Sequence, residues 1–164
     1  MSTKTAAATI DAAQIAQYHI DGFVVVRLHQ DYISWKTFPT TFVTAIVAID
    51  PAEASNGATE VFPGYHQQGC LTPKDGKYHQ LADDAVDVSK GVVLELAPGD
   101  VAIFSGFTPH RSGPNRSAQS CRLLYLSYNA VSDGGDQRDR HCEEFRTWLQ
   151  DRYTEYGRTS TFFR

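Results

Sequence analysis

Short apolar runs separated by turn residues recur along most of this chain. The longest, Thr41–Ile49, is rich in β-branched residues and stops at Asp50-Pro51, which is typical of a buried strand that ends in a turn. Shorter runs of the same kind predict five more strands, at Phe23–Val26, Thr59–Phe62, Val92–Leu96, Val101–Phe104 and Arg122–Tyr128. The pattern indicates a mainly β fold of the sandwich or jelly-roll kind.

Helical patterns occur near both ends of the chain. Asp11 and Gln14 fit a capping box, so we expect a helix from about Ala12 to Ile20. Glu143–Tyr153 carries apolar residues at helical spacing, which predicts an amphipathic C-terminal helix. Residues 67–90 are polar and lack a period, so we expect a long loop there.

The size of the chain points to one domain. With 164 residues, of which 41% are hydrophobic, residues 1–164 can bury a single core. No apolar run is long enough to cross a bilayer, so we expect no contact with a membrane. Met1–Thr9 lacks the basic start and apolar stretch of a secretory signal, which makes the cytoplasm the expected location.

Charge and cysteine content limit the kinds of molecule that this protein is expected to bind. The net charge is −4, and no cluster of Lys or Arg stands out, so nothing in the electrostatics favours nucleic acid. Cys70, Cys121 and Cys142 lack the spacing of a zinc site and are odd in number, which predicts reduced thiols. We therefore expect a small-molecule substrate. The oligomeric state is not defined by these patterns.

The sequence His29-Gln30-Asp31 is the strongest indication of a metal site, and His110, far along the chain, can supply a further ligand. In an extended segment the side chains of His29 and Asp31 point the same way and Gln30 points away. Two imidazoles and one carboxylate can occupy one face of an octahedral iron(II) and leave three positions open for oxygen chemistry. His29, Asp31 and His110 are therefore the candidate metal ligands and catalytic residues.

Several ordered motifs around these residues resemble the phytanoyl-CoA dioxygenase family of iron(II)/2-oxoglutarate oxygenases. The resemblance runs from about His29 to Tyr128 and rests on His29-Gln30-Asp31, Pro63-Gly64-Tyr65-His66, Pro98-Gly99-Asp100-Val101, His110-Arg111-Ser112-Gly113-Pro114-Asn115 and Arg122. It implies a cupin-like double-stranded β-helix with iron at one open end. It also implies Fe(II) as cofactor, with 2-oxoglutarate and O2 as co-substrates.

The resemblance also assigns the co-substrate site. Arg122 matches the arginine that grips the distal carboxylate of 2-oxoglutarate, and a planar, always charged guanidinium suits a carboxylate. Ser112 matches a position whose hydroxyl helps to hold the same molecule, although a turn serine that bonds its own backbone explains it equally well. Arg111 and Arg116 are the alternatives to Arg122, but both are expected in a loop, where they are harder to aim.

The chain departs from the family just before the metal motif. Family members usually carry many more residues before the His-x-Asp motif, whereas here Asp21–Arg27 resembles the family's extreme N-terminal entry and runs straight into Leu28. We interpret the join at residues 27–28 as the loss of a family-typical segment. A jelly roll needs about eight strands, and six are predicted, so the barrel is expected to be incomplete.

The best functional hypothesis is a dioxygenase that hydroxylates a small polar metabolite, with an aminophosphonate as candidate because the motifs resemble bacterial 2-aminoethylphosphonate dioxygenases. The alternative is a shortened, impaired family member that binds metal or a partner without turnover. A cupin-type enzyme without 2-oxoglutarate would leave Arg122 unexplained, and a carbohydrate-binding jelly roll would explain neither Arg122 nor the ligands. The roles of His66 and of the 67–90 loop stay open, and Tyr32, Trp35 and Phe38 are candidates either for substrate contact or for the core.

Overall fold

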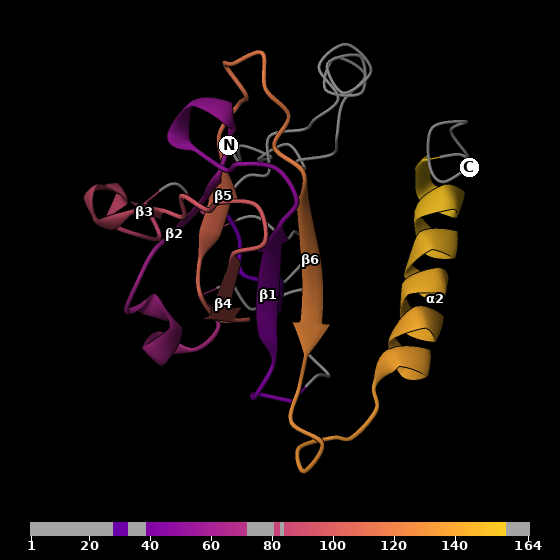
Figure 1. The fold of residues 1–164 in the computed structure, drawn as a ribbon. Coiled ribbons are helices and arrows are strands. Elements are labelled where there is room, and N and C mark those ends of the chain that lie inside the picture. The colour runs from indigo at the N-terminus through magenta and orange to yellow at the C-terminus, as the bar shows by residue number, and fades with distance from the viewer. Residues whose placement is uncertain (1–27, 33–38, 72–80, 83, 157–164) are drawn as a thin grey trace, which may run out of the picture.

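The structure is a computed structural model that describes residues 28–32, 39–71, 81–82 and 84–156. Within these residues the chain forms two three-stranded antiparallel sheets and one long helix (Figure 1). One sheet has the order β4-β1-β6, with strands Val101–Ser105, Val43–Ala48 and Leu123–Tyr128. The other has the order β3-β2-β5, with strands Val92–Val93, Thr59–Val61 and His110–Ser112.

Strand β1 is the centre of the larger sheet because its sequence, VTAIVA, suits burial on both faces. Ile46 lies opposite Ala102 of β4 and Tyr125 of β6. Side chains on adjacent strands share a face when they lie opposite each other. The register therefore fixes two faces of this sheet, and one of them carries Thr44, Ile46 and Phe104.

That face of the larger sheet is turned towards the smaller sheet. The Tyr125 hydroxyl on β6 lies 2.7 Å from the Thr59 hydroxyl on β2. The ring centroids of Phe104 on β4 and His110 on β5 are 4.8 Å apart. We call this the inner face and its opposite the outer face. Two antiparallel sheets packed in this way agree with the predicted jelly roll.

The hydrophobic core lies beside the start of the metal motif. Leu28, Phe62, Leu81 and Val86 form a buried cluster, and the Leu81 amide donates to the Leu28 carbonyl at 2.8 Å. Burying side chains of this size contributes about 1.5–3 kcal/mol each. The cluster holds the backbone immediately before His29 in place.

Most of the strand predictions in the described residues are confirmed, with shifts of one to three residues at their ends. Three short 3₁₀ turns, at Ala54–Asn56, Tyr65–Gln68 and Val88–Lys90, interrupt the connections, so the predicted loop at 67–90 is not without structure. Strand β5 was not predicted, since it has only three residues. The predicted elements Ala12–Ile20 and Phe23–Val26 lie outside the described residues, as does the join at 27–28.

The C-terminal helix is confirmed but is longer than expected. Helix α2 spans Arg138–Tyr156, whereas the sequence predicted Glu143–Tyr153, because charged residues before the apolar positions also favour a helix. None of the helices in the described residues is long and apolar enough to cross a membrane.

Candidate metal centre

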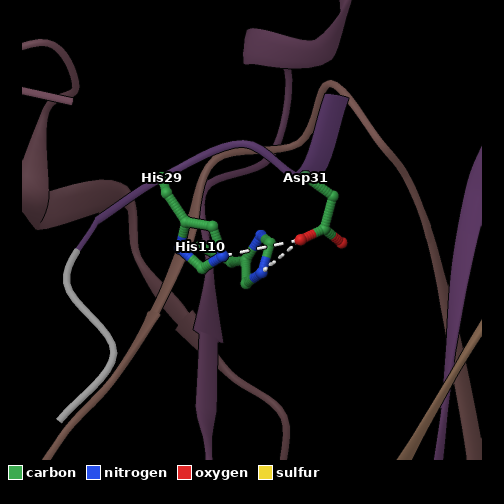
Figure 2. Close-up of side chains that lie close together, drawn as sticks. All are labelled: His29, Asp31 and His110. Atoms are coloured by element: carbon green, nitrogen blue, oxygen red, sulfur yellow. Dashed lines mark ion pairs between the residues drawn. The ribbon is translucent and has the colours of Figure 1, made fainter. Parts of the chain in front are cut away.

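The structure brings His29, Asp31 and His110 together from two distant parts of the chain (Figure 2). One ligand atom from each residue can be chosen so that all three lie within 4.8 Å of one another. Nε2 of His29 and Nε2 of His110 each lie 3.5 Å from the same Asp31 oxygen, Oδ1. The predicted convergence of the three residues is therefore present.

A direct backbone pairing sets the two histidines side by side. His29 and His110 exchange both backbone hydrogen bonds, at 3.0 and 2.9 Å, in an isolated antiparallel bridge. Residues opposite each other in such a pair project to the same side, and the two rings have centroids 4.2 Å apart. This bridge attaches the metal motif to the edge of the smaller sheet through β5.

Asp31 is held as an oriented carboxylate. The Thr44 hydroxyl of β1 donates to Asp31 Oδ2 at 2.5 Å, which leaves Oδ1 directed at the histidines. Burial raises the pKa of Asp31, but the hydrogen bonds that its carboxylate accepts from His29 and Thr44 help to outweigh burial, so the pKa is lowered overall. Asp31 is thus ionised at neutral pH, as a metal ligand must be.

His110 is held as a neutral ligand. Its Nδ1 lies 3.0 Å from the Thr108 carbonyl, and because a carbonyl only accepts, Nδ1 carries the proton of the neutral ring. Burial lowers the pKa of His110, and the charge of His29 lowers it further, so the neutral form prevails at pH 7. Nε2 then offers a lone pair towards Asp31, as in metal sites where the second nitrogen bonds a carbonyl.

Gln30 points away from the ligands, as predicted, and fixes the loops around them. Its fully buried side chain donates to the carbonyls of Gly69 and Phe107, at 2.9 and 2.5 Å, and accepts from the Leu71 amide at 2.7 Å. Three hydrogen bonds to backbone groups leave the amide no freedom to turn. Gln30 therefore locks the metal motif against the segments before β5 and after β2.

The donor set fits a divalent metal ion. An unprotonated Nε2 and an ionised Oδ1 face each other at 3.5 Å, an arrangement of two acceptors that a cation between them would stabilise. For an ion about 2.1 Å from each ligand, neighbouring octahedral ligands lie about 3 Å apart, so a small contraction suffices. Two nitrogens and one oxygen on one side, with positions left open, are the donor set of non-heme iron(II) oxygenases.

Arg122 is not brought to this centre in the structure. Its guanidinium makes a bidentate ion pair with Asp50, with Nε to Oδ2 at 2.7 Å and an amino nitrogen to Oδ1 at 2.8 Å. The side chain is 70% exposed, and the ion pair lowers the pKa of Asp50 to about 2. The assignment of Arg122 to the 2-oxoglutarate carboxylate stays a prediction that these contacts do not support.

Ser112 lies on β5 of the smaller sheet, near the hydroxyls of Thr59 and Tyr125. It sits opposite Thr59 in the β2–β5 register and hydrogen-bonds the Tyr125 phenol. Burial raises the pKa of Tyr125, so the phenol stays protonated and can donate. Burial raises the pKa of the Cys121 thiol, and the charge of Asp50 raises it further.

The remaining sequence candidates lie apart from the ligands or outside the described residues. Arg111 pairs with Glu60 at 2.5 Å and covers the Phe62 ring. His66 is exposed in the 3₁₀ turn Tyr65–Gln68. Tyr32 stacks on Phe107, with centroids 4.1 Å apart, as a packing aromatic would. Arg116 is exposed, and Trp35 and Phe38 lie outside the described residues.

Sequence reasoning missed the residues that support the ligands. The sequence predicts Thr44 only as a strand residue, whereas its hydroxyl bonds Asp31 in the structure. The available signal was a hydroxyl within an apolar strand, as in VTAIVA, because a buried hydroxyl needs a hydrogen-bond partner. That signal predicts that a partner exists but does not identify it.

Comparison with known proteins identifies a protein family that this chain matches. The family model described as Phytanoyl-CoA dioxygenase (PhyH) matches residues 5–123. A methylphosphonate hydroxylase of Gimesia maris is 32% identical over 123 residues, which cover 74% of this chain and 46% of that protein. A 2-aminoethylphosphonate dioxygenase of uncultured bacterium HF130_AEPn_1 is 28% identical, over 68% of this chain and 42% of its own length. The chain thus spans about half the length of these relatives.

Solved structures show the same fold. EvdO2 from Micromonospora carbonacea var. aurantiaca, complexed with 2-oxoglutarate, has a TM-score of 0.50 and 25% identity, covering 66% of this chain and 48% of EvdO2. The apoform of EctD from S. alaskensis has a TM-score of 0.53 and 20% identity, covering 69% of this chain and 41% of EctD. The predicted jelly-roll fold is confirmed by these likenesses, and the chain matches less than half of each structure.

Proposed function

Because this chain belongs to the phytanoyl-CoA dioxygenase family, we propose that it is an iron(II)- and 2-oxoglutarate-dependent dioxygenase whose iron is held by His29, Asp31 and His110. One observation carries the proposal. The three donors converge within 4.8 Å while Thr44 and Thr108 fix the orientation of a carboxylate and an imidazole among them. A structural ion pair would not need this outer support on both residues.

Iron(II), when bound with 2-oxoglutarate and O2, supplies the oxidising chemistry of such a centre. The chain's own residues position the ligands. Thr44 keeps Asp31 Oδ2 engaged, so Oδ1 is the oxygen presented to the ion. The Thr108 carbonyl keeps the proton on Nδ1 of His110 and Nε2 available. Gln30 holds the segment between the first two ligands still.

The proposed reaction is hydroxylation of a small polar metabolite. The names of the two relatives, methylphosphonate hydroxylase and 2-aminoethylphosphonate dioxygenase, support a phosphonate, and an aminophosphonate is our first candidate substrate. We propose residues 1–164 as a single oxygenase domain that lacks a family-typical segment near residues 27–28, and we keep the cytoplasm as its proposed location. Neither nucleic acid nor a membrane is proposed as a partner.

The second candidate is a shortened member that binds metal without turnover. The observation in its favour is the exposure of large apolar side chains on the outer face, including Val101, Ile103 and Leu124. An uncovered sheet face favours association with other chains over a closed active site. Metal binding without product separates this candidate from the first.

The test is anaerobic addition of iron(II) and then 2-oxoglutarate to the purified full chain. We expect the weak visible charge-transfer band of the iron–2-oxo acid chelate, which requires both iron and co-substrate. Admission of oxygen should then yield succinate, and 2-aminoethylphosphonate should increase its rate of formation. A band without succinate would favour the second candidate. No band at saturating iron and 2-oxoglutarate would contradict the first candidate, and no iron binding in a titration would contradict both. The sample without iron is the control.

A further inference from the structure

The outer face of the sheet β4-β1-β6 is apolar, yet it is uncovered. Ile103 lies opposite Ala45, and Leu124 lies opposite Val47, so all four residues project away from the inner face. Ile103 is 68% exposed and Leu124 is 46% exposed. None of the three strands contains a charged residue. A contiguous apolar surface of this kind marks a place where another element or molecule packs.

The sequence of helix α2 contains an apolar stripe. Its members recur at steps of three or four residues, and they are Cys142, Phe145, Leu149, Tyr153 and Tyr156. Such steps place them along one side of a helix. The other positions are mostly charged and mix acids with bases, so the helix lacks the basic face that an anionic membrane attracts. In the described residues α2 makes no extensive contact with any strand. A helix with this pattern needs an apolar surface to pack on.

The turn between β6 and α2 holds the helix beside its own sheet instead of over it. Asn129 donates to the carbonyls of Asp133 and Gly135, both at 2.9 Å. The Thr41 amide donates to Asp133 Oδ2 at 3.3 Å, and the Thr41 hydroxyl accepts from the Ala130 amide at 3.1 Å. Figure 1 shows α2 on the side of β6 that is away from β1. Because the turn is braced in this position, α2 leaves the outer face of its own chain open.

Helix α2 has the dimensions that the outer face requires. Strand β6 has six residues and is about 20 Å long, and three strands span about 14 Å. Helix α2 has 19 residues, so it is about 28 Å long and about 10 Å wide. One helix on one face would bury about 560 Å² of the two surfaces together, whereas two such contacts would bury about 1,100 Å², above the ~1,000 Å² that a specific interface needs. Two copies that exchange their helices make both contacts.

We propose that two copies of this chain exchange their α2 helices, so that α2 of each copy packs on the outer face of the other. A two-fold axis relates the two contacts, which makes the interface isologous. The strands bring no charge into it, so the sheet buries no unpaired ion. Asp31 is bonded by Thr44 on the inner face, so the pairing leaves the metal centre free and goes beyond the proposed function. In dilute solution the monomer prevails, and its outer face is exposed.

Sedimentation velocity of the full chain over a wide range of concentrations tests the pairing. We expect the parent to form a reversible dimer at high concentration. Ile103→Lys places a charge on the outer face, and Leu149→Glu places the opposite charge on the helix stripe. Each variant alone should dimerise at least ~100-fold more weakly, because its dimer would bury two unpaired charges. The controls are Val131→Lys, at an exposed loop residue, and Thr147→Glu, at an exposed position of α2 away from the stripe. Both should dimerise like the parent.

A mixture of the two charged variants makes the test specific for helix exchange. In a mixed dimer, the unaltered helix of the Ile103→Lys copy packs on the unaltered face of the Leu149→Glu copy. The second contact brings the two introduced charges together, and they are opposite in sign. The mixed dimer should therefore recover most of the parent's affinity, although neither variant pairs well with itself. If Leu149→Glu does not fold, Phe145→Glu on the same stripe replaces it.

Four results would overturn the proposal. The first is a parent that stays monomeric at every concentration. The second is a dimer that Leu149→Glu leaves intact, since the two sheets would then pack face against face. The third is a dimer that Ile103→Lys leaves intact, since the helices would then pack on each other. The fourth is a mixture that stays monomeric. Iron titration of both variants should match the parent, and a parent that dimerises without binding iron would contradict the proposed function alone.

Discussion

The inner and outer faces of the sheet β4-β1-β6 share the same strands but differ in what they contact. Thr44 and Ile46 on the inner face are 2% and 0% exposed, and Thr44 bonds a metal ligand candidate. On the outer face Val101, Ile103 and Leu124 are exposed although they are apolar. The polar residues that matter to the site therefore lie on the inner face, and much of the apolar surface lies on the outer one.

The difference teaches that register, rather than residue type, decides which side chain can serve the site. Arg122 suits a carboxylate by its chemistry, but just before β6 its guanidinium is paired with Asp50. A shift of one residue in the pairing would exchange the two faces. Sequence motifs indicate which side chains have suitable chemistry for the site, and the strand pairing decides which of them face it.

The largest expected effect tests the inner face at its metal ligands. His110→Ala removes a buried donor whose Nε2 faces Asp31, so we expect the iron affinity to fall by more than ~100-fold, beyond the range of outer-shell changes. Anaerobic iron titration measures it. His66→Ala, which removes an exposed histidine, is the matched control, and parent-like iron binding by His110→Ala would contradict the assignment.

The next effect compares the same substitution on the two faces. Ile46→Ala creates a cavity at a residue with 0% exposure, and it should lower the free energy of unfolding by about 2–5 kcal/mol. Ile103→Ala, at a residue with 68% exposure, should lower it by less than ~0.5 kcal/mol. Urea unfolding midpoints of the two variants decide this. Equal losses would mean that the outer face is covered in solution.

The metal ligands and most strands could be predicted from sequence because their signals are local. His29 and Asp31 are two residues apart, and the apolar run of β1 is long. The partners of Asp31 and Gln30 could not be predicted, because Thr44 and the Gly69 carbonyl meet them only through tertiary folding. The three-residue strand β5 has no period to detect, yet it carries His110.

A smaller effect is expected at Thr44, which supports a ligand without touching the metal. Thr44→Val has nearly the same shape but leaves Asp31 Oδ2 without its donor, so the iron affinity should fall by about 10–100-fold. Thr44→Ser restores the hydroxyl and should recover most of the affinity. Iron titration and urea unfolding of both variants separate a loss of orientation from a loss of stability. Equal iron affinities for Thr44→Val and Thr44→Ser would mean that the Thr44 hydroxyl does not support the metal centre.

The smallest effect concerns the outer pair of Arg122 and Asp50. The hydrogen bonds from Arg122 hold the pKa of Asp50 at about 2, below its ordinary value of 3.8. A carboxyl whose pKa is lowered by folding stabilises the native state above the unfolded pKa and loses that contribution as pH falls through the folded one. The contribution should therefore be complete above about pH 4.5 and should fade between about pH 4 and pH 2.

Arg122→Gln should thus be slightly less stable than the parent at pH 7, by the small amount typical of an exposed pair, and the difference should shrink below pH 4. Asp50→Asn should produce the same loss at pH 7, and the double variant should lose no more than either single one, because all three lack one shared interaction. Urea midpoints at pH 7, 4 and 3 measure the trend. A difference that stays constant down to pH 3 would mean that Arg122 acts through a partner other than Asp50. The guanidinium would then again be a candidate for binding the 2-oxoglutarate carboxylate.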